Sequence, residues 1–575
     1  MPQVLSAPGL YVEEIPSGVH AIVGTSTSNT AFVDYFPRGP VGVATRVTSL
    51  AEFQRVFGGP DAQSLASYAV TQFFLNGGQL AWIVRVTGKA GQGGTPATLA
   101  AAGAGGLPPA ASPPAASPPA AAAALTAPSP GSWGNNVQIL ATTVGPAGAS
   151  PPSSPKLFNL YAREVADPNA KPIKVLRSEV HLSLSTDAAD PNFAPKVLNA
   201  SSDLVTFPGE QMAPLPSLQS VPASGPDGKA TWSSLSGGTD PVILNPDGTP
   251  SATFPDFIGA ITGTLQPGTS PLDRIEPFHF ELLCVPSLTL LDSSSQGSLY
   301  NSAADTITGY ALEKRAFAIL DPPLDLTPMA IPPDTPDPAA AVARLITWLE
   351  GAAGSGAPSP TANGALYYPS ITVADPLASG RPKRIPASGT LAGIYARTDA
   401  DRGTWKAPAG IEATLSAAAP ALTLTQDDSG SLNPLGINAL RTFPGFGSVV
   451  WGARTLLGAD QQASEWKYVP VRRMALYIEN SLVDGLKWVV FEPNDEPLWS
   501  QIRLNVGTFM HDLFRQGAFQ GMTPKDAYLV RCDSTTTTQS DIDKGVVNIY
   551  VGFAPLKPAE FVVLQIQQLA GQTQA

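Results

Sequence analysis

A long stretch without charge, rich in proline and alanine, interrupts this chain and limits how it can fold. No Asp, Glu, Lys or Arg occurs between Lys89 and Lys156, and residues 108–130 read PPAASPPAASPPAAAAALTAPSP. Such a segment cannot bury enough apolar area to offset the entropy lost on ordering, and its proline pairs favour extended backbone. We therefore interpret residues 89–130 as a surface linker between separately folded parts.

The chain is too long for a single hydrophobic core, so its 575 residues are expected to form several domains. After residue 270, apolar strands that stop at proline, such as FELLCVPS and AFAILDPP, alternate with segments of helical periodicity. This order is typical of a parallel or mixed sheet covered by helices. The fold class that we predict is therefore mixed α/β, with several domains.

Two amphipathic helices are predicted in the last part of the chain, because apolar residues recur at helical spacing over 471–482 and 499–513. Between them, KWVVFEPN (487–494) is interpreted as a strand that ends in a turn. VVNIYVG and FVVLQIQ are two further strands near the C-terminus, and LYVEEIPSG (10–18) contains one near the N-terminus. These end strands need a sheet to join, since an unpaired apolar strand is an aggregation hazard.

The charge and the cysteine content exclude several classes of protein. A net charge of −12 argues against nucleic acid as a partner, because phosphate binding needs a basic surface. Cys284 and Cys532 are too few for a disulfide framework and are interpreted as reduced, buried thiols. The N-terminus shows no signal peptide, and nothing approaches 18 consecutive apolar residues. We expect a chain that folds in a cytoplasm and does not insert into a membrane.

No catalytic or metal-binding arrangement is visible in the sequence. The four histidines have no metal-ligand spacing, and His279 with Glu281 forms an HxE fragment without the PCxxC of zinc deaminases. GPDGKAT (225–231) lacks the spacing of a phosphate-binding loop, and no GxSxG motif occurs. Acidic pairs such as Asp399 and Asp401 are interpreted as solvated loop residues. We predict that the chain is not an enzyme and uses no cofactor or metal.

Several longer motifs occur in a fixed order. They are APGLYVEEIPSG near the N-terminus, PASGTLAGIYARTDADRGTWKAPAG (386–410), LNPLGINALRTFPGFGSVVWGARTL (432–456), WKYVPVRRMALYIENSL (466–482), KWVVFEPNDEPLW (487–499) and the C-terminal run that begins YLVRCDSTTTTQSDIDKG (528–545). Together they closely resemble the contractile tail sheath proteins of phage tails, pyocin-like particles and extracellular contractile injection systems. The resemblance covers residues 1–88 and 271–570. Residues 89–270 match nothing, and in that family the equivalent region is variable and decorates the outside of the particle.

The resemblance implies a division of the chain into six parts. They are an N-terminal inter-subunit arm (1–20), an N-terminal part of the sheath core (21–88), the linker (89–130), a variable, surface-exposed β-rich insertion (131–270), an α/β sheath domain (271–430) and a C-terminal core domain that ends in a strand-exchange arm (431–575). The middle of the family's core is often described as subtilisin-like. No Ser/His/Asp set accompanies that likeness here, so protease activity is not implied.

The resemblance also gives the end strands a partner, because sheath subunits lend their terminal arms to the sheets of neighbouring copies. Such strand addition relies on main-chain hydrogen bonds, and contacts that do not close a ring generate helical filaments. The residues predicted to form the inter-subunit strands are Leu10, Tyr11, Val12, Ile15, Val547, Ile549, Val551, Val562, Leu564 and Ile566.

The function that the resemblance implies is a structural one. Subunits would polymerise helically around an inner tube and contract from a metastable extended state, which drives the tube through a target envelope. Arg472, Arg473 and Lys487 are candidates for contacts with the inner tube. Baseplate and terminal cap proteins are further implied partners. The particle would be assembled in a bacterial cytoplasm and then act in a phage tail or a released, tail-like particle.

Other interpretations remain open at this point. The same sheath could serve a bacteriophage tail rather than an injection system, and the sequence does not decide between them. A secreted subtilisin-like hydrolase or a β-rich adhesin built on residues 131–270 are more distant alternatives. The sequence does not give the helical parameters, ring stoichiometry, trigger, target cell or payload, or a role for residues 89–270.

Overall fold

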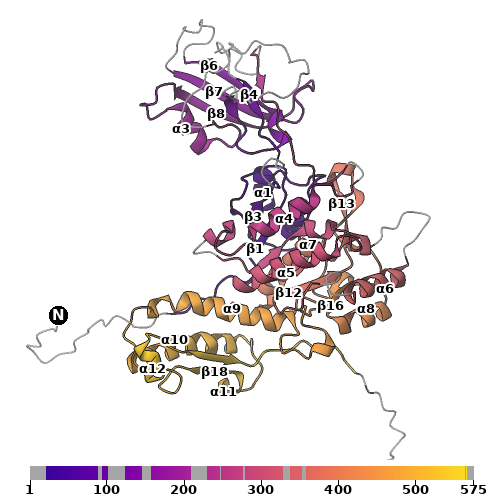
Figure 1. Ribbon diagram of the computed structural model, residues 1–575, viewed down its shortest axis with the longest axis vertical. Helices are drawn as coiled ribbons and strands as arrows, with labels where there is room; N and C mark the ends of the chain where they lie inside the picture. Colours follow the sequence, from indigo (N-terminus) through magenta and orange to yellow (C-terminus); the bar gives the residue numbers. More distant parts are fainter. Residues whose placement is uncertain are drawn as a thin grey trace, which may run out of the picture. The chain divides into compact units, whose positions relative to one another are not determined.

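The computed structural model describes residues 21–88, 94–100, 123–144, 157–208, 230–245, 248–275, 279–327, 337–351, 358–563 and 565 (Figure 1). The chain divides into two compact units. The core unit comprises Ser28–Arg397 and Ala409–Ser464, and the terminal unit comprises Met1–Thr27, Thr398–Pro408 and Glu465–Ala575. The mixed α/β fold class is confirmed. The subtilisin-like detail and the six predicted domain boundaries stay predictions.

An eight-stranded sheet forms the centre of the core unit. Its order is β17 (Gly447–Trp451), β16 (Ile437–Phe443), β12 (Gly364–Tyr368), β11 (Phe317–Leu320), β10 (Leu282–Cys284), β1 (Thr30–Asp34), β3 (Ala81–Arg85) and β2 (Thr45–Val47). The six inner strands are parallel, whereas both edge strands are antiparallel to their neighbours. The strands predicted in FELLCVPS and AFAILDPP are confirmed as β10 and β11. Both are buried along their whole length, as strands covered on both faces must be.

Helices and a small sheet complete this part of the core unit. The helices are α1 (Leu50–Phe57), α2 (Leu65–Leu75), α4 (Phe254–Thr264), α5 (Gly297–Glu313), α6 (Pro338–Leu349), α8 (Gln426–Leu432) and α7 (Ser388–Arg402), whose last residues belong to the terminal unit. A three-stranded antiparallel sheet has the order β14 (Arg381–Ile385), β13 (Ile371–Asp375), β15 (Ala419–Pro420). Aromatic residues of α4 and α5 contribute to the main hydrophobic core.

Two glycines bring α7 unusually close to α2. A Cβ atom added at Gly389 would lie 2.2 Å from the carbonyl oxygen of Ala69, and one added at Gly393 would lie 2.5 Å from that of Phe73. Real Cβ contacts essentially never fall below 3.0 Å. The helix backbones can therefore pack at this distance only because both positions lack a side chain.

A buried carboxylate occupies the point where the strand order reverses. In the sheet, β1 has β3 as its neighbour on one side and β10 on the other. In parallel α/β sheets, ligands commonly bind where the strand order reverses, just outside the carboxyl ends of the strands. Here Asp34, which ends β1, is fully buried and accepts hydrogen bonds from the Ser287 hydroxyl (2.6 Å) and the Ser287 amide (2.7 Å). This carboxylate therefore joins two strand ends within the protein.

A second buried carboxylate lies at the end of β11. Asp321 accepts hydrogen bonds from the backbone amides of Ala387 (2.7 Å) and Ser388 (3.0 Å), where α7 begins. Burial raises the pKa of Asp34 and of Asp321 from 3.8 to about 6, although these hydrogen bonds act in the opposite direction. The native state therefore binds both protons more tightly than the unfolded chain does.

This shift predicts a pH-dependent stability. A carboxyl with a raised pKa is destabilising above pH 6, and the penalty is relieved as the pH falls towards 4. We expect the free energy of unfolding of the wild type to rise, relative to that of Asp321→Asn, by about 2 kcal/mol between pH 7.5 and pH 4. Urea unfolding of both proteins over this range measures the difference. Parallel pH curves for the two proteins would contradict the assignment.

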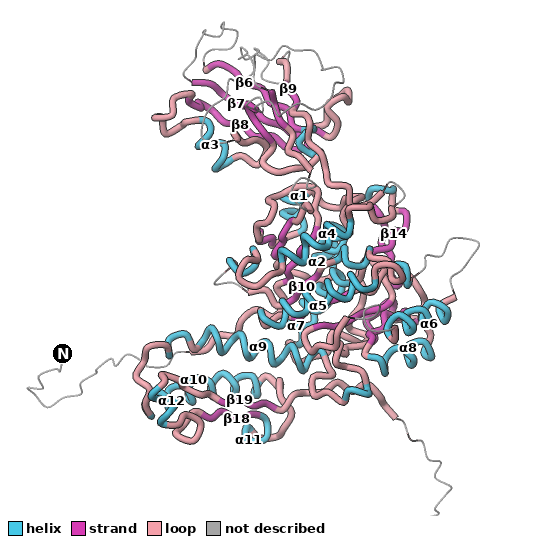
Figure 2. The backbone as a smooth tube through the Cα atoms, viewed as in Figure 1, coloured by secondary structure: helices cyan, strands magenta, loops and turns pink. Residues whose placement is uncertain are grey.

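The insertion folds around its own sheet within the core unit (Figure 2). A four-stranded sheet has the order β8 (Val175–Ser185), β7 (Leu157–Val165), β6 (Val137–Thr143), β9 (Ser233–Ser234), and α3 (Ala194–Ser201) packs with it. Two more strands, β4 (Thr98–Ala100) and β5 (Ala123–Thr126), pair with each other inside the segment interpreted as a linker. That interpretation is therefore wrong for these ends, because Leu125 is buried in the insertion's core. Residues 101–122 lie outside the described residues.

The terminal unit is built on two long helices, α9 (Val469–Gly485) and α10 (Glu496–Arg515), which confirms both predicted helices. It also contains α11 (Pro524–Ala527), α12 (Gln539–Asp543), β18 (Tyr528–Arg531) and β19 (Tyr550–Phe553). No helix in the described part of the chain combines the length and the apolar character that a membrane span requires.

The strand predicted over residues 487–494 is wrong. Lys487–Val489 forms a 3-10 turn, and the following residues lead directly into α10. Asn494 accepts a hydrogen bond from the Trp499 indole (2.9 Å), and the Asp495 side chain accepts one from the amide of Leu498 (3.3 Å). These polar residues cap the helix, so the local hydrogen bonds favour a helix start over an extended strand.

Candidate subunit interface

A two-stranded antiparallel sheet in the terminal unit has two open edges. β18 pairs with β19 from Tyr528 opposite Phe553 to Arg531 opposite Tyr550, and no third strand of the described chain joins either side. Just beyond β19, an isolated bridge pairs Pro555 with Phe519. Figure 2 shows both strands beside α10. An edge strand presents unpaired backbone amides and carbonyls, which form a template for another strand. This small sheet can therefore accept additional strands.

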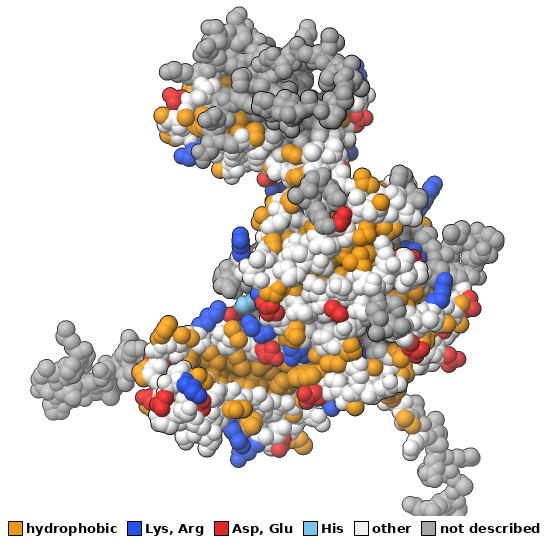
Figure 3. Space-filling model, viewed as in Figure 1, with side chains coloured by type: hydrophobic (Ala, Val, Ile, Leu, Met, Phe, Trp, Pro, Cys, Tyr) orange, Lys and Arg blue, Asp and Glu red, His pale blue; other side chains and the backbone are white. Residues whose placement is uncertain are grey.

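Exposed apolar residues accompany the open sheet. On the strands, the side chains of Leu529 and Tyr550 are 47% and 59% exposed. Further along the chain, Phe561, Val562 and Val563 are 75–79% exposed and belong to no strand. Figure 3 shows hydrophobic side chains on the visible surface of this unit. These three consecutive apolar side chains are therefore largely in contact with solvent in this chain.

Some of the predicted C-terminal arm residues pair or pack within the chain, and the others do not. The strand expected over 546–551 begins later, at Tyr550, and Val551 pairs with Val530 of the same chain. Val547 and Ile549 precede the strand and pack against the hydrophobic cluster around α10. The strand is shorter because Asn548 forms hydrogen bonds with Thr536 and Thr537 instead.

The other arm residues are not paired within the chain. Val562, predicted to form an inter-subunit strand, is 79% exposed and lies outside any strand of the described chain. Leu10, Tyr11, Val12, Ile15, Leu564 and Ile566 lie outside the described residues. The role of all these residues in joining subunits stays a prediction.

The prediction that Arg473 contacts an inner tube is wrong for this conformation of the chain. Its side chain is 3% exposed and forms an ion pair with Asp399 (2.6 Å), and it donates a hydrogen bond to the carbonyl oxygen of Thr27 (2.8 Å). Asp399 is also 3% exposed, so its interpretation as a solvated loop residue is wrong as well. Sequence spacing gave no signal of this pair, because 74 positions separate the two residues.

The two remaining tube candidates lie in partly or largely exposed positions. Arg472 forms an ion pair with Glu479 (3.3 Å), and its guanidinium carbon lies 5.0 Å from the centre of the Trp466 ring. Lys487 pairs with Asp484 (2.8 Å), and 65% of its side chain is exposed. Their contact with a tube stays a prediction.

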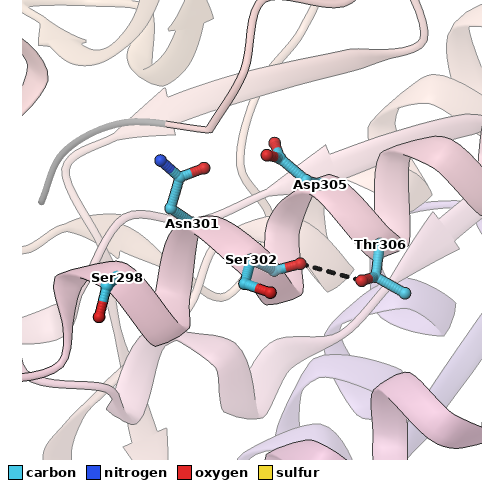
Figure 4. A pocket seen from close by; sticks show the side chains of 5 residues that line it. All are labelled: Ser298, Asn301, Ser302, Asp305 and Thr306. Atoms are coloured by element: carbon cyan, nitrogen blue, oxygen red, sulfur yellow. Dashed lines mark hydrogen bonds between the residues drawn. The ribbon is translucent and has the colours of Figure 1, made fainter. Parts of the chain in front are cut away.

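A hollow on α5 is lined only by polar side chains of that helix. It has a volume of about 560 Å³ and is lined by Ser298, Asn301, Ser302, Asp305 and Thr306 (Figure 4). The Thr306 hydroxyl donates to the carbonyl oxygen of Ser302 (2.9 Å), and Asp305 accepts from the amide and hydroxyl of Ser359. No His, Cys, Asp and Glu grouping within the described residues could hold a metal ion.

Comparisons with known proteins match the chain over two long regions. Residues 268–456 match the phage tail sheath protein central domain, and residues 461–568 match the phage tail sheath C-terminal domain. The tail sheath protein of Vibrio phage KVP40 is 30% identical over 188 residues, which are 32% of this chain and 26% of that protein. A putative prophage major tail sheath protein of Pseudomonas aeruginosa (strain UCBPP-PA14) is 27% identical over 34% of this chain and 48% of its own length.

Solved structures extend the likeness to almost the whole chain. The sheath of an extracellular contractile injection system, the PVC sheath complex in its contracted state, aligns over 99% of both chains with a TM-score of 0.53 and 19% identity. The sheath tail protein Lin1278 of Listeria innocua aligns over 93% of this chain and 96% of its own, with a TM-score of 0.54 and 12% identity. At these identities the structures show a shared fold.

The matched segments span a quarter to a half of the curated relatives' lengths. The two family models nevertheless cover adjacent regions in the order found in the family, and they include the open sheet of the terminal unit. The chain therefore belongs to the contractile tail sheath family.

Proposed function

We propose that the chain is the structural subunit of a contractile sheath. It would polymerise helically around an inner tube and contract from a metastable extended state, which drives the tube through a target envelope. The observation that carries this proposal is the two-stranded sheet of β18 and β19, which has open edges, together with the exposed run of Phe561, Val562 and Val563. Family membership supports the same role.

In this proposal, copies of the chain complete one another. The N-terminal arm around Leu10–Ile15 and the C-terminal arm from Phe561 would add strands to the β18–β19 sheet of neighbouring subunits. Main-chain hydrogen bonds hold such added strands, so subunits can turn relative to one another without separating. A repeated head-to-tail contact of this kind does not close and generates a helical filament.

The energy of contraction would come from packing between subunits. Two arrangements of the same subunits that differ in buried contact form a bistable system, and the tighter one lies lower in free energy. The chain would need no cofactor, metal or catalytic activity for this purpose. Its partners would be the inner tube, with contacts at Arg472 and Lys487, and the baseplate and terminal cap proteins. Assembly would take place in the bacterial cytoplasm, before the particle acts in a tail or is released.

Removal of residues 1–18 tests the arm model. We expect the truncated chain to be a folded monomer that forms no sheath, because these residues would supply the strand that neighbours need. Negative-stain microscopy of full-length and truncated protein, each expressed with its tube protein, shows whether striated tubes form. Circular dichroism establishes that the truncated chain is folded.

A second variant separates the two ends of the chain. Replacement of Phe561, Val562 and Val563 with serine changes an exposed run that contributes nothing to the described core, so folding should persist while assembly is lost. Normal sheaths from both variants would overturn the arm model, whereas no sheath from the full-length chain would overturn the proposed function itself. Capsid genes beside this gene would favour a phage tail over an injection system.

A further inference from the structure

A cavity of about 200 Å³ lies at the base of the insertion, within the core unit. Arg38, Gly39 and Pro40 line one side together with Arg55 at the end of α1. The insertion contributes the other side. Its lining residues include Ser129, Trp133, Arg177 and Asp203. Two parts of the fold that are far apart in sequence therefore meet around one pocket that is partly open to solvent.

Three arginines line this cavity, and two carboxylates beside it, Glu164 and Asp203, form ion pairs with them. Arg38 donates two hydrogen bonds to Glu164 (both 3.0 Å), and Arg177 donates one to the same carboxylate (2.6 Å). Arg55 pairs with Asp203 (3.1 Å). A third carboxylate, that of Glu179, accepts hydrogen bonds from the Ser202 hydroxyl (2.6 Å) and the Asp203 amide (3.1 Å). The cavity therefore gathers three cationic side chains in a chain whose net charge is −12.

Two buried donors of residues that line the cavity have no acceptor in the described protein. They are Arg38 Nε and Trp133 Nε1. Arg177 donates to Glu164 through its Nε atom, and 22% of its side chain is exposed. A buried donor without an acceptor is destabilising, and more so when it is charged. An acceptor from outside the chain would relieve this cost.

Arg38 and Arg177, whose side chains are 13% and 22% exposed, also repel each other. Burial lowers the pKa of Arg38, the carboxylate of Glu164 raises it, and the positive charge of Arg177 lowers it further. Their guanidinium carbons lie 6.0 Å and 5.9 Å from the centre of the Trp133 ring. A negative charge bound beside them would reduce this repulsion.

We propose that this cavity binds a small oxyanion, which is a phosphate or carboxylate group free or on a small molecule. The planar, forked guanidinium is the side chain best suited to bind such groups through paired hydrogen bonds. The volume lies below the roughly 300–1,000 Å³ of sites for drug-sized ligands, so the ligand is small. Its binding links the insertion to the α1 end of the core, independently of the sheath role.

Titration of the full-length protein with inorganic phosphate tests the proposal. We expect saturable binding by isothermal titration calorimetry in chloride buffer of matched ionic strength, and acetate as a second titrant distinguishes phosphate from carboxylate recognition. Arg177→Gln should weaken the binding by about tenfold or more, the loss typical of one hydrogen bond to a charged group. Lys196→Gln serves as the matched control, because Lys196 is an exposed cation of the insertion that does not line the cavity.

Arg177 also forms an ion pair with Glu164, so its replacement can lower the stability of the insertion as well as the affinity for the anion. A second variant separates these two effects. Arg55→Gln changes a side chain that is 55% exposed and lines the same cavity, and we expect it to weaken phosphate binding with an unchanged thermal unfolding temperature. Absence of saturable heat for both anions with the wild type would overturn the proposal. Equal affinities of wild type, R177Q and R55Q would overturn it as well.

Discussion

Replacement of Arg473 with alanine is expected to destabilise the terminal unit by about 3–5 kcal/mol. The change leaves the carboxylate of Asp399 buried without its ion-pair partner, and it removes the hydrogen bond to the Thr27 carbonyl. An unpaired buried charge is one of the largest single penalties in a folded protein. Chemical denaturation, followed by tryptophan fluorescence, measures the loss.

Two further variants show whether the buried charge is the cause. Lys487→Ala removes a cation from a pair that is largely exposed, and it should cost no more than about 1 kcal/mol. The double variant Arg473→Met with Asp399→Leu removes both charges and should recover most of the lost stability, since apolar pairs often replace buried ion pairs without loss. If the free energy of unfolding of the single variant R473A lies within about 1 kcal/mol of the wild-type value, the ion pair does not stabilise this unit.

Replacement of Gly389 with alanine is expected to destabilise the core unit by about 1–3 kcal/mol or more. The new methyl group would overlap the backbone of α2 at Ala69, so α7 and α2 have to move apart and lose their contacts. Backbone atoms cannot rotate away as a flexible side chain can. Thermal unfolding of the two proteins gives the difference.

The control for this substitution lies on α5. Gly309 is a helix-interior glycine with no atom near its missing side chain, so Gly309→Ala should raise stability by up to about 1 kcal/mol through helix propensity alone. Opposite signs for the two glycine-to-alanine changes identify close packing as the cause. A stabilised G389A protein would mean that the helices are not in contact at this position.

Much of the core could be predicted because its strands and helices carry strong local patterns. Buried parallel strands such as β10 and β11 are continuous apolar runs that end at proline, and their short length and the flanking prolines favour a strand over a helix. The helices α9 and α10 show regular apolar spacing over several turns. The resemblance then supplied the family and the role of the chain ends, which the residues alone did not give.

The predictions that are wrong depend on contacts between distant residues or on local capping. The segment 487–494 is apolar enough for a strand, but Asn494 and Asp495 bond to the start of α10 and end any extension. Arg473 and Asp399 look like surface charges until the fold brings them together. The strands β4 and β5 flank a proline-rich segment whose composition hides them.

The terminal unit joins segments that are far apart in the sequence, and this has a consequence for synthesis on the ribosome. Thr27 accepts a hydrogen bond from Arg473, 446 positions later, so this contact cannot form until residue 473 has left the ribosome. Closing so long a loop is slow compared with local folding. This contact therefore forms late, after the residues of the core unit (28–397 and 409–464) have been synthesised.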